Sequence, residues 1–480
     1  MKKNKESSLF EDKKLKSGSA ENIPIQAPSN NEMQKLIDYY QNGQLDDAER
    51  LAKSITEQFS YHSFGWKVLG AVFERIGKKP EALDAMQRAV QLKEQDDEAH
   101  NNLGVALQER GRLEEAEVSY RQAILLNADY TESYYNLGNT LKELGKLDEA
   151  EASYRKAISL ENDFADAHNN LGIILKELGK LNDAETSFRQ AIFLKPGFVE
   201  PTYGLGILLY EGKKFEKAAE QFMLIDFRMS KVYLLRCFYM QDQRTKFYNN
   251  LDNMLKKGEN NALIGSLICG SNIRYGIDKY NPFCSKPLMY VLETNLLDQC
   301  DFKTVFIDSA NEILGNQKVQ KKTQDLLTKG VQTSGNVFFQ AGAAANIIQD
   351  IIHFELEKYR ICFQDSKEGL ITNWPKDYQL NGWLISMKSG GELNSHMHER
   401  GWISGSIYIN VTPKVNSDSG NLVLELGNVK NELGEGKNKK SINVVTGSLC
   451  LFPSSLHHYT IPFVSEENRI VLAFDVIPKN

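Results

Sequence analysis

The chain has 480 residues, which is enough for two or three domains, and its formal net charge at pH 7 is a mild −6. Because no basic block accompanies this charge, nucleic acid and membrane surfaces are not expected partners. No run approaches the roughly 18 apolar residues of a membrane-spanning helix. The six cysteines are scattered without a CxxC pair, a pattern typical of the reducing cytoplasm and not of a disulfide framework or zinc cluster.

The first 28 residues are polar and rich in lysine, glutamate and serine. They lack the apolar stretch of a signal peptide, so we expect a disordered tail.

A Leu-Gly pair then recurs every 34 residues, and alanines, an aromatic residue and a turn glycine keep the same period. This is the length of a helix–turn–helix unit that stacks into a solenoid, because one such hairpin cannot bury its apolar face alone. The pairs stand at 69–70, 103–104, 137–138, 171–172 and 205–206. The array resembles tetratricopeptide repeats. In the same frame Gly43 and Ala48 add one degenerate unit upstream, which predicts six repeats over residues 29–230.

Three successive repeats place an asparagine directly before the Leu-Gly pair: Asn102, Asn136 and Asn170. In this type of repeat the first helix of each pair lines the concave groove, so these amides could pair with the peptide groups of an extended chain. The row resembles the asparagine ladder of protein O-GlcNAc transferases and predicts a protein or peptide partner. The alternative is a solvated polar face.

After the repeats, residues 231–325 keep a helical pattern that Asn281-Pro282 and Lys286-Pro287 interrupt. We interpret this stretch as an irregular helical cap and linker. From about residue 380 the pattern changes to short β-branched or aromatic runs separated by turn residues, which predicts a β-sandwich or jelly roll with flanking helices over residues 326–480. The loop 428–440 is either a lid or plain surface. The predicted strands are 382–388, 404–411, 421–426, 442–445, 448–452 and 469–476.

Four of the eight histidines lie after residue 380, among the predicted strands. His396 and His398 are two residues apart in an extended segment, so both rings can face one ion. His457 and His458 are neighbours and point to opposite faces of a strand, so only one of them can join. With Arg469 on the following strand, the set suits a metal with open positions and an anionic cosubstrate.

The runs HMHERGWISGSIYINVTP, GSLCLFPSSLHHYTIPF and RIVLAFDVIP resemble a bacterial family of 2-oxoglutarate/Fe(II)-dependent oxygenases, a double-stranded β-helix fold that often follows tetratricopeptide repeats. The resemblance implies Fe(II) as cofactor and 2-oxoglutarate as cosubstrate. It makes His396, His398 and His458 the metal ligands and catalytic residues, and it makes Arg469 the partner of the distal carboxylate of 2-oxoglutarate.

One position departs from the wider superfamily, because His398 stands where Asp or Glu is usual. Glu392 and Glu399 are close enough in sequence to contribute a carboxylate, although neither has the two-residue spacing. Trp402 and Tyr408 either line the pocket or belong to the core. The sequence therefore predicts a hydroxylase whose repeats bind a polypeptide. The alternative is a non-catalytic interaction scaffold with a degenerate jelly-roll module.

Overall fold

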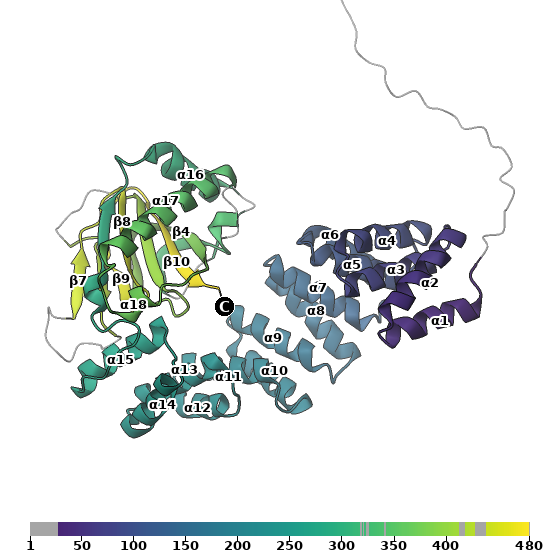
Figure 1. Cartoon of the computed structure of the whole chain (residues 1–480), viewed down its shortest axis with the longest axis horizontal. Helices are drawn as coiled ribbons and strands as arrows, with labels where there is room; N and C mark the ends of the chain where they lie inside the picture. Colours follow the sequence, from purple (N-terminus) through teal and green to yellow (C-terminus); the bar gives the residue numbers. More distant parts are fainter. Residues whose placement is uncertain are drawn as a thin grey trace, which may run out of the picture. The chain divides into compact units, whose positions relative to one another are not determined.

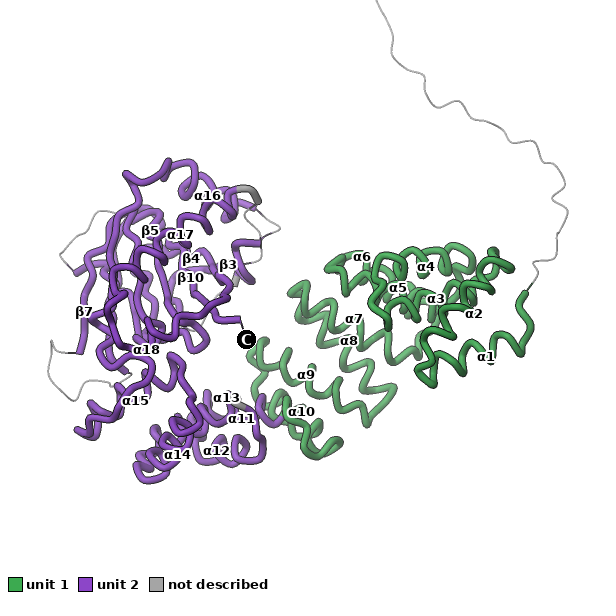
Figure 2. Tube along the Cα trace, viewed as in Figure 1, with its two compact units in different colours: residues 1–201 green, residues 202–480 purple. Residues whose placement is uncertain are grey.

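The computed structural model describes residues 27–479 except 317, 318, 320, 323–325, 340, 341, 412–417 and 428–437. Most of the predicted tail and most of the loop 428–440 therefore lie outside the described residues. The chain divides into two compact units, which meet in sequence at Pro201 and Thr202 (Figure 2). The domain boundaries expected at residues 29, 231 and 326 remain predictions.

The first unit consists of antiparallel helix pairs that follow one another along the chain (Figure 1). A sixth pair begins at its end and continues into the second unit, so the solenoid predicted from the 34-residue period is confirmed. The pairs are α1 (Asn30–Gln41) with α2 (Leu45–Gln58), α3 (Ser63–Arg75) with α4 (Lys79–Leu92), α5 (Asp97–Gln108) with α6 (Leu113–Leu126), α7 (Thr131–Glu143) with α8 (Leu147–Leu160), α9 (Ala165–Glu177) with α10 (Leu181–Leu194), and α11 (Val199–Glu211) with α12 (Phe215–Met223).

The Leu-Gly signature has a steric cause. A Cβ atom built on Gly104 would lie 2.6 Å from a ring carbon of Tyr120, and one on Gly138 would lie 2.7 Å from Tyr154. The aromatic ring of the second helix thus packs directly on the backbone of the first, where only glycine leaves room. Both tyrosines are fully buried.

The second unit begins with further helices and then forms an antiparallel sheet. Its helices are α13 (Arg228–Met240), α14 (Arg244–Lys256), α15 (Ala262–Tyr275), α16 (Ser309–Gly315), α17 (Gly342–Cys362) and the single turn α18 (Gly369–Thr372). Short helices η1 (Pro287–Tyr290), η2 (Lys303–Asp308) and η3 (Val337–Phe339) lie between them. No helix among the described residues has both the length and the apolar character needed to cross a lipid bilayer.

The sheet runs in the order β1-β8-β5-β10-β4-β9-β6-β7, with β3 also on β4 and β2 on β3, and every pairing is antiparallel. This curled antiparallel sheet confirms the predicted jelly-roll class. Its strands are β1 (Leu292–Asn295), β2 (Lys321–Lys322), β3 (Leu327–Thr333), β4 (Tyr378–His396), β5 (Ile403–Asn410), β6 (Leu422–Glu425), β7 (Lys439–Ile442), β8 (Ser448–Pro453), β9 (His457–Thr460) and β10 (Arg469–Pro478).

The strands β2, β3 and β9 were not among the six predicted strands, and two further strands differ in a more informative way. Residues 292–295, in the predicted helical linker, form β1 and pair with β8 at Leu292 opposite Leu451. The strand expected at 442–445 lies instead at Lys439–Ile442, because β6 pairs with it from Leu422 opposite Ile442 to Glu425 opposite Lys439. Its lysines are acceptable since β7 is an edge strand, where charged side chains are common.

Side chains alternate between two faces of the sheet, as the pleat requires. One face packs on α17 through a buried cluster that contains Leu472 and Phe474 of β10 (Figure 1). The other face lines the inside of the curl with Val471 and Ala473. Because Arg469 and Asp475 share the odd-numbered positions of β10, they also face inward, at either end of the same row.

Candidate metal centre

Antiparallel pairing of β4 with β9 places His396 directly opposite His458. Their ring centroids are 4.2 Å apart, and the His398 ring lies 5.1 Å from His396 and 4.8 Å from His458. One ligand atom from each of these three residues lies within 4.8 Å of the other two. The structure thus brings together the three histidines that the sequence singled out.

The hydrogen bonds of His396 and His398 determine which nitrogen of each ring is available to a metal ion. His396 Nδ1 lies 2.8 Å from the Asn394 carbonyl oxygen, and His398 Nδ1 lies 2.6 Å from Asp475 Oδ1. Carbonyl and carboxylate oxygens only accept, so both Nδ1 atoms carry a proton, and in the neutral form of each ring Nε2 is the bare nitrogen. These two Nε2 atoms face each other at 3.2 Å.

This arrangement fits a cation. Two unprotonated nitrogens have no hydrogen to share, whereas an ion with ligand bonds of roughly 2 Å would satisfy both. The third ring offers a further indication, because His458 is buried and its Nδ1 has no hydrogen-bond partner. A set of three imidazoles suits a divalent first-row transition metal such as iron or zinc.

The electrostatics keep the rings in the ligand form. Burial, with a smaller contribution from His398, lowers the pKa of His396 to about 4. Burial likewise holds the pKa of His458 well below its usual range. Neutral imidazole is the form that binds metals, so these rings are ready to coordinate at neutral pH.

Asp475 is a member of the site that the sequence analysis missed. It is buried, it contacts His398, and it also accepts a hydrogen bond from Ser404 Oγ at 2.7 Å. The negative charge that a two-His-one-carboxylate site would hold as a ligand is here placed behind a histidine. Its position as the one acidic residue within the apolar run RIVLAFDVIP could have indicated a special role from the sequence.

Neither glutamate considered as a carboxylate ligand belongs to the cluster. Glu399 is turned to α13, where its carboxylate accepts hydrogen bonds from Tyr233 and Arg236. Glu392 pairs with Thr328 of β3 along the strand. His457 lies opposite Glu425 and so points to the other face of β9 from His458.

Arg469 is almost fully buried, and its Nη1 donates to the Gly420 carbonyl while Nε and Nη2 have no partner. Its guanidinium lies 5.0 Å from the ring centroid of Tyr408. Tyr408 and the three histidines line a small cavity of about 30 Å³, of which Arg469 is not a lining residue. Tyr408 therefore contacts Arg469 and also lines the cavity of the histidines. Trp402 belongs to the core, and its Nε1 donates to the Leu370 carbonyl.

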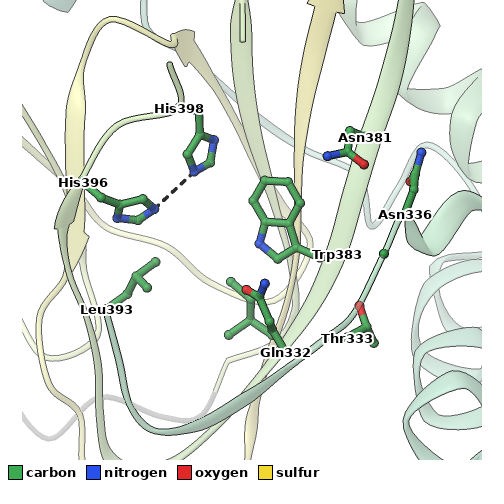
Figure 3. A pocket seen from close by; sticks show the side chains of 10 residues that line it. Gln332, Thr333, Asn336, Asn381, Trp383, Leu393, His396 and His398 are labelled. Carbon is green, nitrogen blue, oxygen red and sulfur yellow. Dashed lines mark hydrogen bonds between the residues drawn. The ribbon is translucent and has the colours of Figure 1, made fainter. Parts of the chain in front are cut away.

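A larger cavity of about 430 Å³ opens beside His396 and His398 (Figure 3). Trp383 lines both cavities, and its ring lies 5.2 Å from that of His398. Gln332 and Asn381 also line the larger one. The sequence analysis singled out none of these three, because β3 was not predicted and Trp383 had no motif around it.

The asparagines predicted to bind peptide are all half-buried. Asn136 Nδ2 donates to Asn101 Oδ1 at 3.2 Å, and Asn170 Nδ2 donates to Asn139 Oδ1 at 2.9 Å. Two of the three amides therefore join neighbouring repeats, a role that the sequence analysis did not foresee.

Comparisons with known proteins agree with this division of the chain. Residues 381–475 match the family described as "Putative 2OG-Fe(II) oxygenase". Tetratricopeptide repeat families match residues 34–97, 106–145, 138–179 and 169–225. The chain thus carries tetratricopeptide repeats followed by a domain that matches this oxygenase family. No curated protein matches the chain.

Solved structures similar to this chain have low sequence identity. One was reported as the functional characterization of pilF from Pseudomonas aeruginosa, with 18% identity over 40% of this chain and 90% of that one, and a TM-score of 0.37. Another is YrrB, described as a TPR protein with an unusual peptide-binding site, with 17% identity over 41% and 96% and a TM-score of 0.33. A third is MamA, with 24% identity over 35% and 93% and a TM-score of 0.31.

Proposed function

We propose that the second unit is a 2-oxoglutarate- and Fe(II)-dependent oxygenase that hydroxylates its substrate. The observation that carries this proposal is the meeting of His396 Nε2 and His398 Nε2 at 3.2 Å, on a sheet face that also holds Arg469. The match of residues 381–475 to the oxygenase family supports it. When bound, Fe(II) and 2-oxoglutarate together supply the activation of O2 that inserts an oxygen atom into a C–H bond.

The residues of the chain have separate roles in this proposal. His396, His398 and His458 hold the metal and leave coordination positions open. Asp475 keeps the proton on His398 Nδ1, so that Nε2 faces the ion. Arg469 holds a carboxylate of 2-oxoglutarate through its two unpaired N–H groups, and Tyr408 moves aside or shares that contact, because the cavity between Tyr408 and the histidines has room for only a few water molecules.

Two measurements on the full-length protein test the proposal. Anaerobic titration with Fe(II) or Co(II) is expected to show one site that is lost in His396→Ala. Incubation with Fe(II), O2 and 2-oxoglutarate is expected to release succinate. Arg469→Lys should bind metal normally but release little succinate, since it keeps the charge and loses the planar fork, whereas the exposed Arg360→Lys should match the wild type.

We further propose that the repeats bind a protein or peptide, which is the usual role of such arrays. Asn102 makes no side-chain hydrogen bond within the described residues, so its amide is free to reach a partner. If the protein is instead a non-catalytic interaction scaffold, its second unit should not convert 2-oxoglutarate. Metal binding without any succinate release would favour this alternative.

A further inference from the structure

The cavity of about 430 Å³ beside His396 and His398 has a distinct chemistry. Trp383 forms one wall, between the amides of Asn381 and Gln332 and across the opening from the two histidines (Figure 3). No carboxylate, ammonium or guanidinium group belongs to the described residues that line it. In the metal-free protein, a charged substrate group would therefore lose its hydration without gaining a counter-charge from the lining side chains.

Some polar groups of the cavity are already committed to the backbone. Asn336 Oδ1 accepts from the Gly382 amide at 3.0 Å, and Asn336 Nδ2 donates to the Leu380 carbonyl at 2.8 Å. Thr333 Oγ1 accepts from the Leu384 amide at 3.1 Å. These side chains hold the strands together and have little capacity left for a ligand.

Gln332 and Asn381 differ from them. Gln332 is only 8% exposed, and its Oε1 has no hydrogen-bond partner. It lies opposite Ile385 of β4, which places it on the same inward face as Trp383. Asn381 makes no side-chain hydrogen bond with the described residues either. A buried acceptor without a donor destabilises the protein, and a ligand that supplies the donor removes this cost.

The ligand that fits is uncharged, planar and able to donate and accept at once. A planar group can stack on the Trp383 indole, while an NH2 group reaches Gln332 Oε1 and a carbonyl accepts from an amide NH2. A carboxamide combines these properties, whereas a carboxylate has no donor and an aliphatic chain leaves Gln332 unpaired. The preceding tetratricopeptide repeats favour a polypeptide as its source.

We propose that this cavity binds the side-chain carboxamide of an Asn or Gln residue in a polypeptide substrate. The assignment rests on the proposed oxygenase function, since it places the carboxamide beside the histidines that would hold the metal. It makes Gln332, Asn381 and Trp383 the residues that determine specificity.

Four blocked amino acids that differ only in the side chain test the assignment: the N-acetyl α-methyl esters of asparagine, glutamine, aspartate and leucine, in which only the first two contain a primary carboxamide. Binding is measured on the metal-free full-length protein, without 2-oxoglutarate, by fluorine NMR after 5-fluorotryptophan labelling. The resonance of Trp383 among the four tryptophans is assigned with Trp383→Phe. The asparagine or glutamine compound should shift this resonance and bind at least about tenfold more tightly than the other two.

Gln332→Leu should abolish this preference and make the asparagine and leucine compounds equivalent. It should leave the melting temperature unchanged or raise it, because it removes an unpaired buried acceptor. Gln364→Leu, at an exposed position, should behave as the wild type. A loss of preference in Gln332→Leu without a loss of stability therefore marks a binding role.

Equal binding of the aspartate compound, or an unchanged preference in Gln332→Leu, would overturn the proposal. So would displacement of the asparagine compound by uridine at similar concentration, which would assign the cavity to a nucleobase. Because the assay contains no metal, its failure alongside succinate release rejects the carboxamide assignment alone. Carboxamide binding without succinate release in the separate turnover assay rejects the oxygenase function instead.

Discussion

His398 Nδ1 lies 2.6 Å from Asp475 Oδ1, so a carboxylate stands directly behind one histidine of a cluster that has no carboxylate of its own. Ser404 donates to the same oxygen and holds it in place. A partner of this kind fixes the tautomer of a ligating histidine and raises its basicity. Position 398 thus lacks the usual ligating carboxylate, but Asp475 supplies a negative charge directly behind the His398 ring.

Asp475→Asn is expected to weaken metal binding on the order of 10- to 100-fold. The amide can donate to His398 Nδ1, which would move the ring proton to Nε2 and block the ligand position. Calorimetric titration with Co(II) measures the change. Asp377→Asn, at an exposed position outside the site, is the matched control, and equal affinity of both variants would contradict the proposed role of Asp475.

Glu399 shows how the next residue along the chain is held. Its two carboxylate oxygens accept from Tyr233 and Arg236 of α13, and both members of the ion pair with Arg236 are mostly buried, with 24% and 20% of their side chains exposed. The Arg236 guanidinium also lies 5.0 Å from the ring centroid of Tyr210. A helix that follows the repeats thereby anchors the segment that carries His398.

A double-mutant cycle with Arg236→Gln and Glu399→Gln should give a coupling free energy of roughly 1.5–3 kcal/mol, typical of a hydrogen-bonded charged pair. Tryptophan fluorescence reports it, since three of the four tryptophans lie in the second unit. Lys231→Gln, which removes the exposed ion pair with Asp226, should cost less than about 1 kcal/mol. Coupling near zero would show that Glu399 is not anchored by Arg236.

The repeats offer a separate test through Asn170, which donates to Asn139 Oδ1 and to the Tyr135 hydroxyl of the preceding repeat. Asn170→Ala should lower the free energy of unfolding of the solenoid by about 1–3 kcal/mol, because it leaves half-buried partners unpaired. Urea unfolding followed by far-UV circular dichroism measures this. Asn182→Ala, at an exposed position on α10, should change it by less than about 0.5 kcal/mol.

Features set by local spacing were predictable from the sequence. The 34-residue period arises because each repeat forms the same kind of packing contact, such as that of Tyr120 on Gly104. The two-residue spacing of His396 and His398 reports the pleat of a strand. In both cases the residues that meet are close in sequence or recur regularly.

Features set by strand register were not predictable. Pairing of β1 with β8 joins Leu292 to Leu451 across a long stretch of chain, and nothing near Leu292 indicates it. The same holds for Asp475, whose inward direction follows from alternation with Arg469 but whose contact with His398 depends on how β10, β4 and β5 align. The inward position of Gln332 likewise depends on the pairing of β3 with β4, which places it opposite Ile385.

His457 provides the last prediction, which concerns pH. Burial, with a smaller contribution from the positive charge of Arg236, lowers the pKa of His457 to about 4. In the unfolded chain the pKa of a histidine is about 6.5. As pH falls from about 6.5 to about 4, the unfolded state therefore binds this proton first, and the metal-free protein loses stability over that window.

His457→Gln should remove one group whose protonation in the unfolded state lowers the stability as the pH falls. The drop in stability of the second unit between pH 7 and pH 5 should become smaller than in the wild type, as measured by urea unfolding followed by tryptophan fluorescence. Metal affinity should not change, because His457 lies opposite Glu425 on the other face of β9. His458→Gln should instead lose metal affinity. If His457→Gln lost metal binding and His458→Gln kept it, the two neighbouring histidines would have to exchange roles.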